Sequence, residues 1–240
     1  MKEKFIEHPL QGRGKLTYEW LPNINKLLDI GCAYGYYTKF YLNKCKNVYG
    51  IDPNEDLIKI AKKRYPKIKF KIGSAEKIPF KDNYFDVVLL NDVLEHVNNE
   101  EKTLSEIYRV LKENGIIILT VPHKGLFRFM DVDNYSWYAR NKFPKLYKII
   151  RKEITVKPGY EKKHRHYSIK DIEKLFEGKF KIEKFTRRGL FLGYFINNLK
   201  LIIRILFGKE IKILYSTKDL DYNISYGKLS GSLAVKVIKI

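Results

Sequence analysis

The chain has 240 residues, of which 45% are hydrophobic and 14% aromatic, so its composition excludes wholesale disorder and suits one well-buried domain. Its two cysteines form no CxxC pair, which argues against a disulfide framework or a cysteine-based zinc site and fits a reduced intracellular compartment. The formal net charge is +20, and residues 140–212 carry 21 Lys and Arg against 7 Asp and Glu.

Short apolar runs alternate with helical patterns along the first half of the chain. The apolar runs predict strands at 26–30, 47–51, 69–72, 85–90 and 116–121. The spacing of apolar residues predicts helices at 36–43, 55–64 and 99–111. Asn114 and Gly115 are expected to end the third helix, and Pro122 the fifth strand. Continuous apolar strands that alternate with helices indicate a parallel sheet covered by helices on both faces.

One helix and two strands are predicted in the last third of the chain. The helix spans 168–176, with Ser168 as its N-cap and Asp171 in the position of a capping box. The strands are 179–186 and 233–240, where apolar and polar residues alternate. No repeat or low-complexity linker divides the chain, so a single domain of residues 1–240 is expected.

Two basic, aromatic-rich segments, 123–165 and 188–230, do not fit the alternation of strands and helices. If the fifth and sixth strands run parallel to the first four, both segments leave from the carboxyl edge of the sheet. Open α/β sheets bind ligands at that edge, so we expect these insertions to form a cap over the active site.

No signal peptide or membrane span is predicted, because the amino terminus lacks an apolar core and no run of about 18 uncharged apolar residues occurs. The expected location is cytoplasmic. Within 190–207, a narrow polar stripe interrupts an otherwise apolar helical pattern. Such a helix can lie peripherally in an anionic membrane interface, form a buried part of the cap, or belong to a dimer face.

The stretch LLDIGCAYGYYT, residues 27–38, places Gly31 and Gly35 between a strand that carries Asp29 and a helix. Glycine lets the backbone turn tightly and approach a ligand closely. Asp52 follows Gly31 by 21 residues, at the end of the second strand, where a carboxylate can accept both hydroxyls of a ribose. A dinucleotide would satisfy that pattern as well. However, Asp29 would repel a pyrophosphate, and the third glycine of GxGxxG is missing.

Together with GSAE at 73–76 and NDVLEHV at 91–97, this loop resembles the class I S-adenosylmethionine-dependent methyltransferases, in the ubiquinone/menaquinone-type branch of small-molecule enzymes. The resemblance covers 25–122 and is weaker over 167–185. Ala33 stands where the family commonly has a glycine. It implies a Rossmann-like fold with a mainly parallel seven-stranded sheet and S-adenosylmethionine as the cofactor. The expected cofactor-binding residues are Asp29, Gly31, Cys32, Ala33, Gly35, Tyr36, Asp52, Pro53, Ser74, Ala75, Glu76 and Asn91. Alternatively, Asp52-Pro53 is an ordinary turn, and Glu76 stands at the start of a helix.

Methyl transfer from a sulfonium is an in-line displacement, for which the protein mainly aligns the acceptor and excludes water. A general base is needed only for a poorly acidic hydroxyl or a carbon acid. The candidate catalytic residues are Asp92, His96, His123 and His166, with His164 as an alternative to His166. His96 could instead hold a strand–helix junction, and His166 could simply lead into a helix. No metal is expected, because the pair of His164 and His166 has no cysteine or carboxylate cluster nearby in the sequence.

The leading hypothesis is methylation, at oxygen or carbon, of a small-molecule or lipid- or glycan-linked acceptor. The turn (Asp/Asn)-Pro-Pro-(Tyr/Phe), usual for exocyclic amino groups of DNA, is absent after the fourth strand. The positive charge of 140–212 indicates an anionic partner, such as a phosphorylated substrate, an acidic membrane surface or nucleic acid. Alternatively, this charge reflects only lysines spread over solvated faces. An RNA methyltransferase is the alternative, without a recognisable RNA-binding motif. A cofactor-binding scaffold at a membrane surface, without transferase activity, is the third hypothesis.

Overall fold

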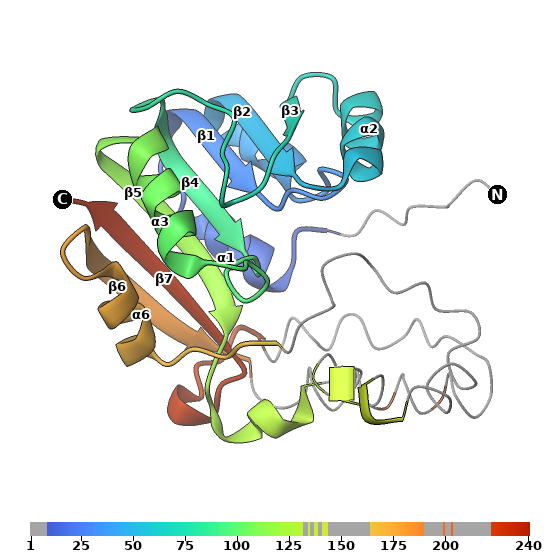
Figure 1. Cartoon of the computed structure of the whole chain (residues 1–240), viewed down its shortest axis with the longest axis vertical. Coiled ribbons are helices and arrows are strands. Elements are labelled where there is room, and N and C mark those ends of the chain that lie inside the picture. The colour runs from blue at the N-terminus through green and yellow to red at the C-terminus, as the bar shows by residue number, and fades with distance from the viewer. Residues whose placement is uncertain are drawn as a thin grey trace.

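A computed structural model describes residues 9–131, 164–189 and 222–240, together with the positions 134, 137–138, 141–143, 199 and 203. Its strands form one seven-stranded sheet in the order β3-β2-β1-β4-β5-β7-β6 (Figure 1). The strands are β1 (Ile24–Ile30), β2 (Cys45–Asp52), β3 (Lys69–Ile72), β4 (Phe85–Asn91), β5 (Leu111–Pro122), β6 (Phe180–Arg188) and β7 (Ser232–Lys239). The helices are α1 (Gly12–Trp20), η1 (Thr38–Asn43), α2 (Glu55–Arg64), α3 (Glu100–Val110), η2 (Leu126–Met130), α6 (Ile169–Phe176) and η3 (Gly227–Leu229).

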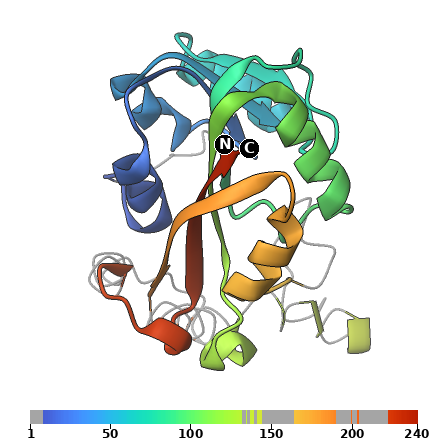
Figure 2. The same cartoon turned by 90° about the vertical axis from the view of Figure 1, so that its left-hand side faces the viewer.

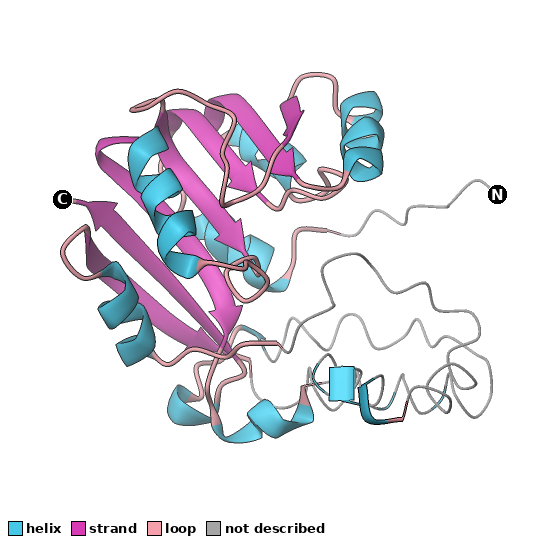
Figure 3. Cartoon of the chain, in the orientation of Figure 1, coloured by secondary structure: helices cyan, strands magenta, loops and turns pink. Residues whose placement is uncertain are grey.

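The sheet is parallel except for one strand. β1 runs parallel to β2 and β4, and the pairs β2–β3 and β4–β5 are also parallel. β7 is antiparallel to both of its neighbours, β5 and β6, as its arrowhead shows in Figure 3. β6 therefore runs in the same direction as β5, so both predicted insertions begin at the carboxyl edge of the sheet. Most of their residues, and nearly all of 190–207, lie outside the described part of the chain.

Successive residues of the central strands face opposite sides of the sheet, as the pleat requires. Leu28 and Leu90 belong to a core with α3 and α6, whereas Leu27 and Leu89 belong to a core with η1 and α2. α1 lies on the η1 side, where Tyr18 packs partly buried against the second core. Figure 2 shows these helices on the two sides of the sheet. The prediction of a sheet covered on both faces is confirmed.

Local capping explains where several helices begin. Asn54 and Asn99 each accept a backbone N–H of the first turn of α2 and α3. At α6, the predicted capping box is present, because Ser168 Oγ accepts from Asp171 N at 3.2 Å and Asp171 Oδ2 accepts from Ser168 N at 2.7 Å. Ser168 thus begins the helix that covers the end of the sheet.

Three local predictions are wrong. The first predicted helix, 36–43, is a 3-10 helix that begins later, at Thr38. Helix α3 ends at Val110, before Asn114, because the buried Leu111 already pairs with Phe85 of β4. Asn114 and Gly115 therefore lie inside β5, where the register shifts, and Asn114 has a φ of 60°. Helix α1 was missed, since its sequence GRGKLTYEW contains two glycines and no clear apolar face.

The described residues contain no helix that is both long enough and apolar enough to cross a membrane.

Candidate functional site

The turn after β1 passes close to two neighbouring strands. The backbone N–H groups of Gly31 and Cys32 both donate to the carbonyl of Ile51 in β2, at 2.8 and 3.0 Å. Gly31 has a φ of 72°, and a Cβ atom there would lie 2.5 Å from Val93 Cγ2, so this position requires glycine. Ala33 also has a positive φ, 47°, although an alanine is disfavoured there. Burial raises the pKa of the Cys32 thiol, which suits a packing role.

Two buried carboxylates flank this turn. Asp29 of β1 is 4% exposed and accepts a hydrogen bond of 2.6 Å from Thr38 Oγ1. Burial, opposed by this bond and assisted by the negative charge of Asp52, raises the pKa of Asp29 to about 7. Asp52 accepts from the N–H groups of Ala33 at 3.0 Å and Asn54 at 2.9 Å, and burial raises its pKa as well. A pair of like charges held in a dry site suits a positively charged ligand.

This pair is the feature that fits S-adenosylmethionine, which carries an ammonium and a sulfonium. Asp29 could pair with the ammonium, and each oxygen of Asp52 keeps acceptor capacity for a ribose hydroxyl beside its backbone hydrogen bond. The chain fits the cofactor at this point through the chemistry of its donors and acceptors.

The remaining expected cofactor residues lie around the same strand ends. Gly73 N donates to the carbonyl of Asp52 at 3.2 Å, so the segment that contains Ser74 and the buried Ala75 starts beside Asp52. Pro53 is exposed and follows Asp52 directly, and Tyr36 is half-buried, near Gly35. These positions are adjacent to the glycine turn, and their contact with a cofactor stays a prediction.

Two more of the expected residues, Asn91 and Glu76, also have defined protein partners. Asn91, at the end of β4, accepts from Thr17 Oγ1 at 2.7 Å and donates to Tyr41 OH at 3.1 Å. No helix begins at Glu76, contrary to the alternative interpretation. Its carboxylate instead accepts the N–H groups of Asn98, at 2.5 Å, and Asn99, just before α3. Glu76 thus joins the loop after β3 to the loop after β4.

The loop after β4 carries two acidic side chains, of which the sequence indicated only Asp92 as a candidate catalytic residue. Asp92 has a φ of 55°, accepts from Thr120 Oγ1 at 3.2 Å and forms an ion pair with Arg13 of α1. Glu95 is 1% exposed, and neither of its carboxylate oxygens has a hydrogen-bond partner among the described residues. Burial, with the negative charge of Asp92 beside it, raises the pKa of Glu95 well above its ordinary value.

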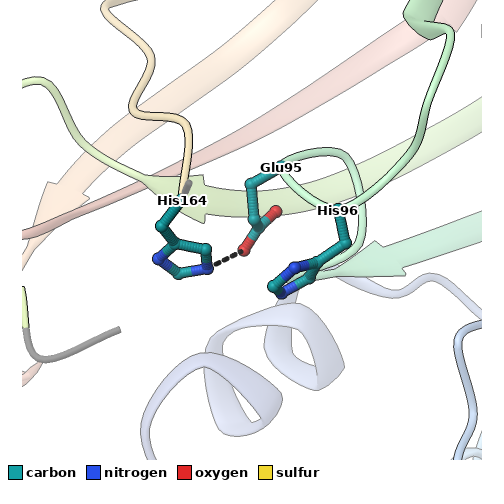
Figure 4. Close-up of side chains that lie close together, drawn as sticks. All are labelled: Glu95, His96 and His164. Atoms are coloured by element: carbon teal, nitrogen blue, oxygen red, sulfur yellow. Dashed lines mark ion pairs between the residues drawn. The ribbon is translucent and has the colours of Figure 1, made fainter. Parts of the chain in front are cut away.

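Three histidines and two carboxylates gather at this loop; we call Glu95, His96, Asp131, His164 and His166 the histidine cluster. His164 Nε2 lies 3.7 Å from Glu95 Oε1, and the rings of His96 and His164 are 4.9 Å apart (Figure 4). On its other side, His164 Nδ1 lies 2.8 Å from Asp131 Oδ2, which is also 3.1 Å from His166 Nε2. Burial, with the neighbouring His164, lowers the pKa of His96 to about 4.

The four candidate catalytic residues are thus placed differently. His96 and His166 belong to the histidine cluster, and Asp92 precedes it. His123 is buried, with its Nδ1 at 2.8 Å from the carbonyl of Ser230, and burial lowers its pKa. The sequence did not indicate Asp131, because nothing local relates it to a histidine 33 residues away. Glu95 lies in LEHV, but only the fold shows that its carboxylate is buried.

Known proteins resemble the part of the chain that contains the glycine turn. A family model described as "Methyltransferase domain" matches residues 28–119. A demethylmenaquinone methyltransferase of Renibacterium salmoninarum is 31% identical over 120 residues, which are 50% of either chain. A ubiquinone biosynthesis O-methyltransferase of Pelagibacter ubique is 37% identical over 110 residues, 44% of this chain and 45% of the relative. The chain therefore spans no more than half of the length of these relatives.

The fold is also found in solved structures. A crystal structure described as an S-adenosylmethionine-dependent methyltransferase of Methanosarcina mazei superposes with a TM-score of 0.60 at 19% identity, covering 94% of this chain and 97% of the other. At this identity the likeness concerns the Rossmann-like fold alone. The family match ends at residue 119, so Asp131, His164 and His166 of the histidine cluster lie beyond it.

Proposed function

We propose that this chain transfers the methyl group of S-adenosylmethionine to a small-molecule or lipid- or glycan-linked acceptor, at oxygen or carbon, because residues 28–119 match a methyltransferase domain and relatives with this domain are named as S-adenosylmethionine-dependent enzymes. The observation that carries the proposal is the buried pair of Asp29 and Asp52 around the glycine turn. When bound, the cofactor supplies a methyl group attached to a sulfonium sulfur. This sulfur leaves readily as a neutral thioether when the methyl group is transferred.

The protein's task in this reaction is to hold the cofactor, to orient the acceptor toward it and to exclude water. Asp29 would neutralise the ammonium of the cofactor, and Asp52 would accept the ribose hydroxyls. The turn at Gly31 lies against Val93, next to the loop that begins with Asp92. The acceptor would therefore approach from the carboxyl edge of the sheet, where the histidine cluster lies. This placement follows the general rule for ligands of open α/β sheets.

We propose His96 and His166 ahead of Asp92 and His123 as the side chains that face the acceptor. The Nδ1 atom of His123 lies against a carbonyl, and Asp92 is already paired with Arg13. The names of the two relatives, an O-methyltransferase of ubiquinone biosynthesis and a demethylmenaquinone methyltransferase, support a small-molecule acceptor. The excess of positive charge in 140–212 supports an acceptor, or a surface, that carries negative charge.

Calorimetric titration with S-adenosylmethionine and S-adenosylhomocysteine tests the cofactor site. Asp52→Ala should lower the affinity for both by at least about tenfold, because it removes a charged hydrogen-bond acceptor. Asp56→Ala is the matched control, since Asp56 is an exposed carboxylate of α2. Unchanged binding by Asp52→Ala, or no binding by the wild type, would refute the assignment.

The acceptor class is tested with cofactor that carries a radioactive methyl group, incubated with the protein and a cell extract. Label in lipids or in water-soluble small molecules supports the proposal. Label in tRNA would refute the proposal and support the RNA methyltransferase alternative. Cofactor binding without label in any fraction would favour the non-catalytic scaffold. Flotation of the protein with anionic vesicles, against neutral ones, tests the peripheral membrane association.

A further inference from the structure

The carboxyl group of Glu95 is buried without the hydrogen bonds that an ionised carboxylate needs. It is 1% exposed, and the described residues offer neither of its oxygens a hydrogen bond. A carboxylate removed from water without such partners is unfavourable by several kcal/mol, so native proteins pair it or let it ligate a metal. His164 Nε2, at 3.7 Å, is too distant for a hydrogen bond to Glu95.

The atoms around Glu95 are close enough together to be ligands of one metal ion. One oxygen of Glu95, one ring nitrogen of His96 and one of His164 all lie within 4.8 Å of one another, and the three side chains converge in Figure 4. Two ligand atoms on one tetrahedral ion are about 3.4 Å apart when each bond is about 2.1 Å long. The separation of 3.7 Å between Glu95 and His164 is close to this spacing. We propose that Glu95, His96 and His164 bind a divalent transition-metal ion.

The surroundings of His164 support this assignment. Its Nδ1 lies 2.8 Å from Asp131 Oδ2, so the N–H at Nδ1 donates to that carboxylate and Nε2 keeps its lone pair on the side of Glu95. A carboxylate behind a histidine in this way is the usual outer shell of a zinc-type site, where it fixes the tautomer and orients the ring. Asp131 is itself buried, at 4% exposure.

The two segments that carry the ligands are fastened together. The guanidinium of Arg165 donates to the carbonyls of Leu94, at 2.8 Å, and Val97, at 2.6 Å, on either side of Glu95 and His96. Tyr167 OH donates to Glu100 Oε1 at 2.5 Å and to the carbonyl of Leu94 at 3.2 Å. His164 is therefore held against the loop after β4 although it comes from a distant part of the sequence. Such support is what a preorganised site needs.

Two imidazole nitrogens and one carboxylate oxygen favour Zn²⁺, Co²⁺ or Mn²⁺ over Mg²⁺, which prefers oxygen ligands. Three protein ligands leave positions open for an oxygen atom from outside. In this arrangement His96 is a ligand and not a base. If the proposed function holds, the ion would bind and orient an acceptor oxygen, which favours methylation at oxygen. Binding of the ion itself does not depend on the proposed function.

Titration of the EDTA-treated full chain with Co²⁺, followed by its visible absorption bands, tests the site directly. We expect one Co²⁺ per chain, displaced by Zn²⁺ and little affected by Mg²⁺. His164→Ala and Glu95→Gln should each weaken Co²⁺ binding by more than about tenfold, since even outer-shell changes cause losses of that size. His123→Gln is the matched control, because it changes a buried histidine outside the histidine cluster and should leave Co²⁺ binding unchanged.

A second measurement guards against variants that merely misfold. Glu95→Gln keeps the size of a buried side chain that has no hydrogen-bond partner among the described residues, so without metal its melting temperature should be close to that of the wild type, while the rise on adding Zn²⁺ should disappear. Failure of the wild type to bind Co²⁺ and Zn²⁺, or binding by both ligand variants as tight as by the wild type, would overturn the proposal. Calorimetry with S-adenosylmethionine on the same samples separates the two proposals, since loss of cofactor binding alone contradicts only the proposed function.

Discussion

Replacing Asp29 by asparagine tests the electrostatics of the glycine turn. The pKa of Asp29 is raised from 3.8 to about 7, mainly by burial. A raised carboxyl pKa means that the folded state prefers the protonated form. Its contribution to stability is therefore complete below pH 4 and is lost as the pH rises through 7. Asparagine is neutral at every pH, and its side-chain oxygen can still accept from Thr38, so Asp29→Asn should remove this loss.

The magnitude follows from the shift. A difference of about three pKa units corresponds to about 4 kcal/mol at high pH, and about 2–3 kcal/mol of it develops between pH 5 and 8. Urea unfolding of the protein without cofactor, followed by circular dichroism at both pH values, measures this change. The free energy of unfolding of Asp29→Asn minus that of the wild type should be larger at pH 8 than at pH 5 by that amount, which means that the variant is relatively more stable at pH 8. Asp56→Asn, an exposed carboxylate, should show no such trend.

The same titration should appear in cofactor binding. The affinity of the wild type for S-adenosylmethionine should rise from pH 6 to 7.5, because the ionised carboxylate pairs with the ammonium, while that of Asp29→Asn should be lower and flat. This range stays below the α-amino pKa of about 7.7–8.0. A relative stability of Asp29→Asn that is equal at pH 5 and pH 8 would refute the reasoning.

Two further predictions concern residues that contact the segment between β4 and α3. Gly31→Ala should lower the free energy of unfolding by about 2–4 kcal/mol, because the alanine is strained at this φ and its Cβ meets Val93. Adding Val93→Ala should recover part of the loss. A change below about 0.5 kcal/mol in the single variant would contradict the close contact. Tyr167→Phe removes the hydrogen bonds to Leu94 and Glu100, so it should lower the free energy of unfolding, measured in urea, by about 1–3 kcal/mol and weaken Co²⁺ binding. An unchanged free energy of unfolding together with unchanged Co²⁺ affinity would show that these bonds do not hold the ligand segments together.

The positions of the strands along the chain and the turn after β1 could be predicted because their signals are local. Runs such as 85–90 are apolar throughout, as strands buried on both faces must be. The cap of α6 follows from Ser168 and Asp171 alone. Asp29 and Asp52 could be placed together because the carboxyl ends of neighbouring parallel strands meet at one edge.

Tertiary contacts decided what could not be predicted. The sequence favours ending α3 at Asn114, but Leu111 pairs with Phe85 and turns the chain into β5 four residues after Ile107. The pairing of His164 with Asp131 and Glu95 joins segments with no common pattern. The absence of a carboxylate cluster near His164 in the sequence was therefore a poor guide to its neighbours in space.

The position of β7 also sets the order in which the sheet can be completed during synthesis. β7 lies between β5 and β6, yet it follows both in the chain. From Pro122, at the end of β5, to Ser232, at the start of β7, the ribosome must add 110 residues, which takes roughly 5–20 s at about 5–20 residues per second. Throughout that interval, one side of β5 is an unpaired, apolar edge of the nascent sheet, open to pairing with other chains. The topology therefore leaves this edge of β5 without its final partner until the last strand of the sheet has been made.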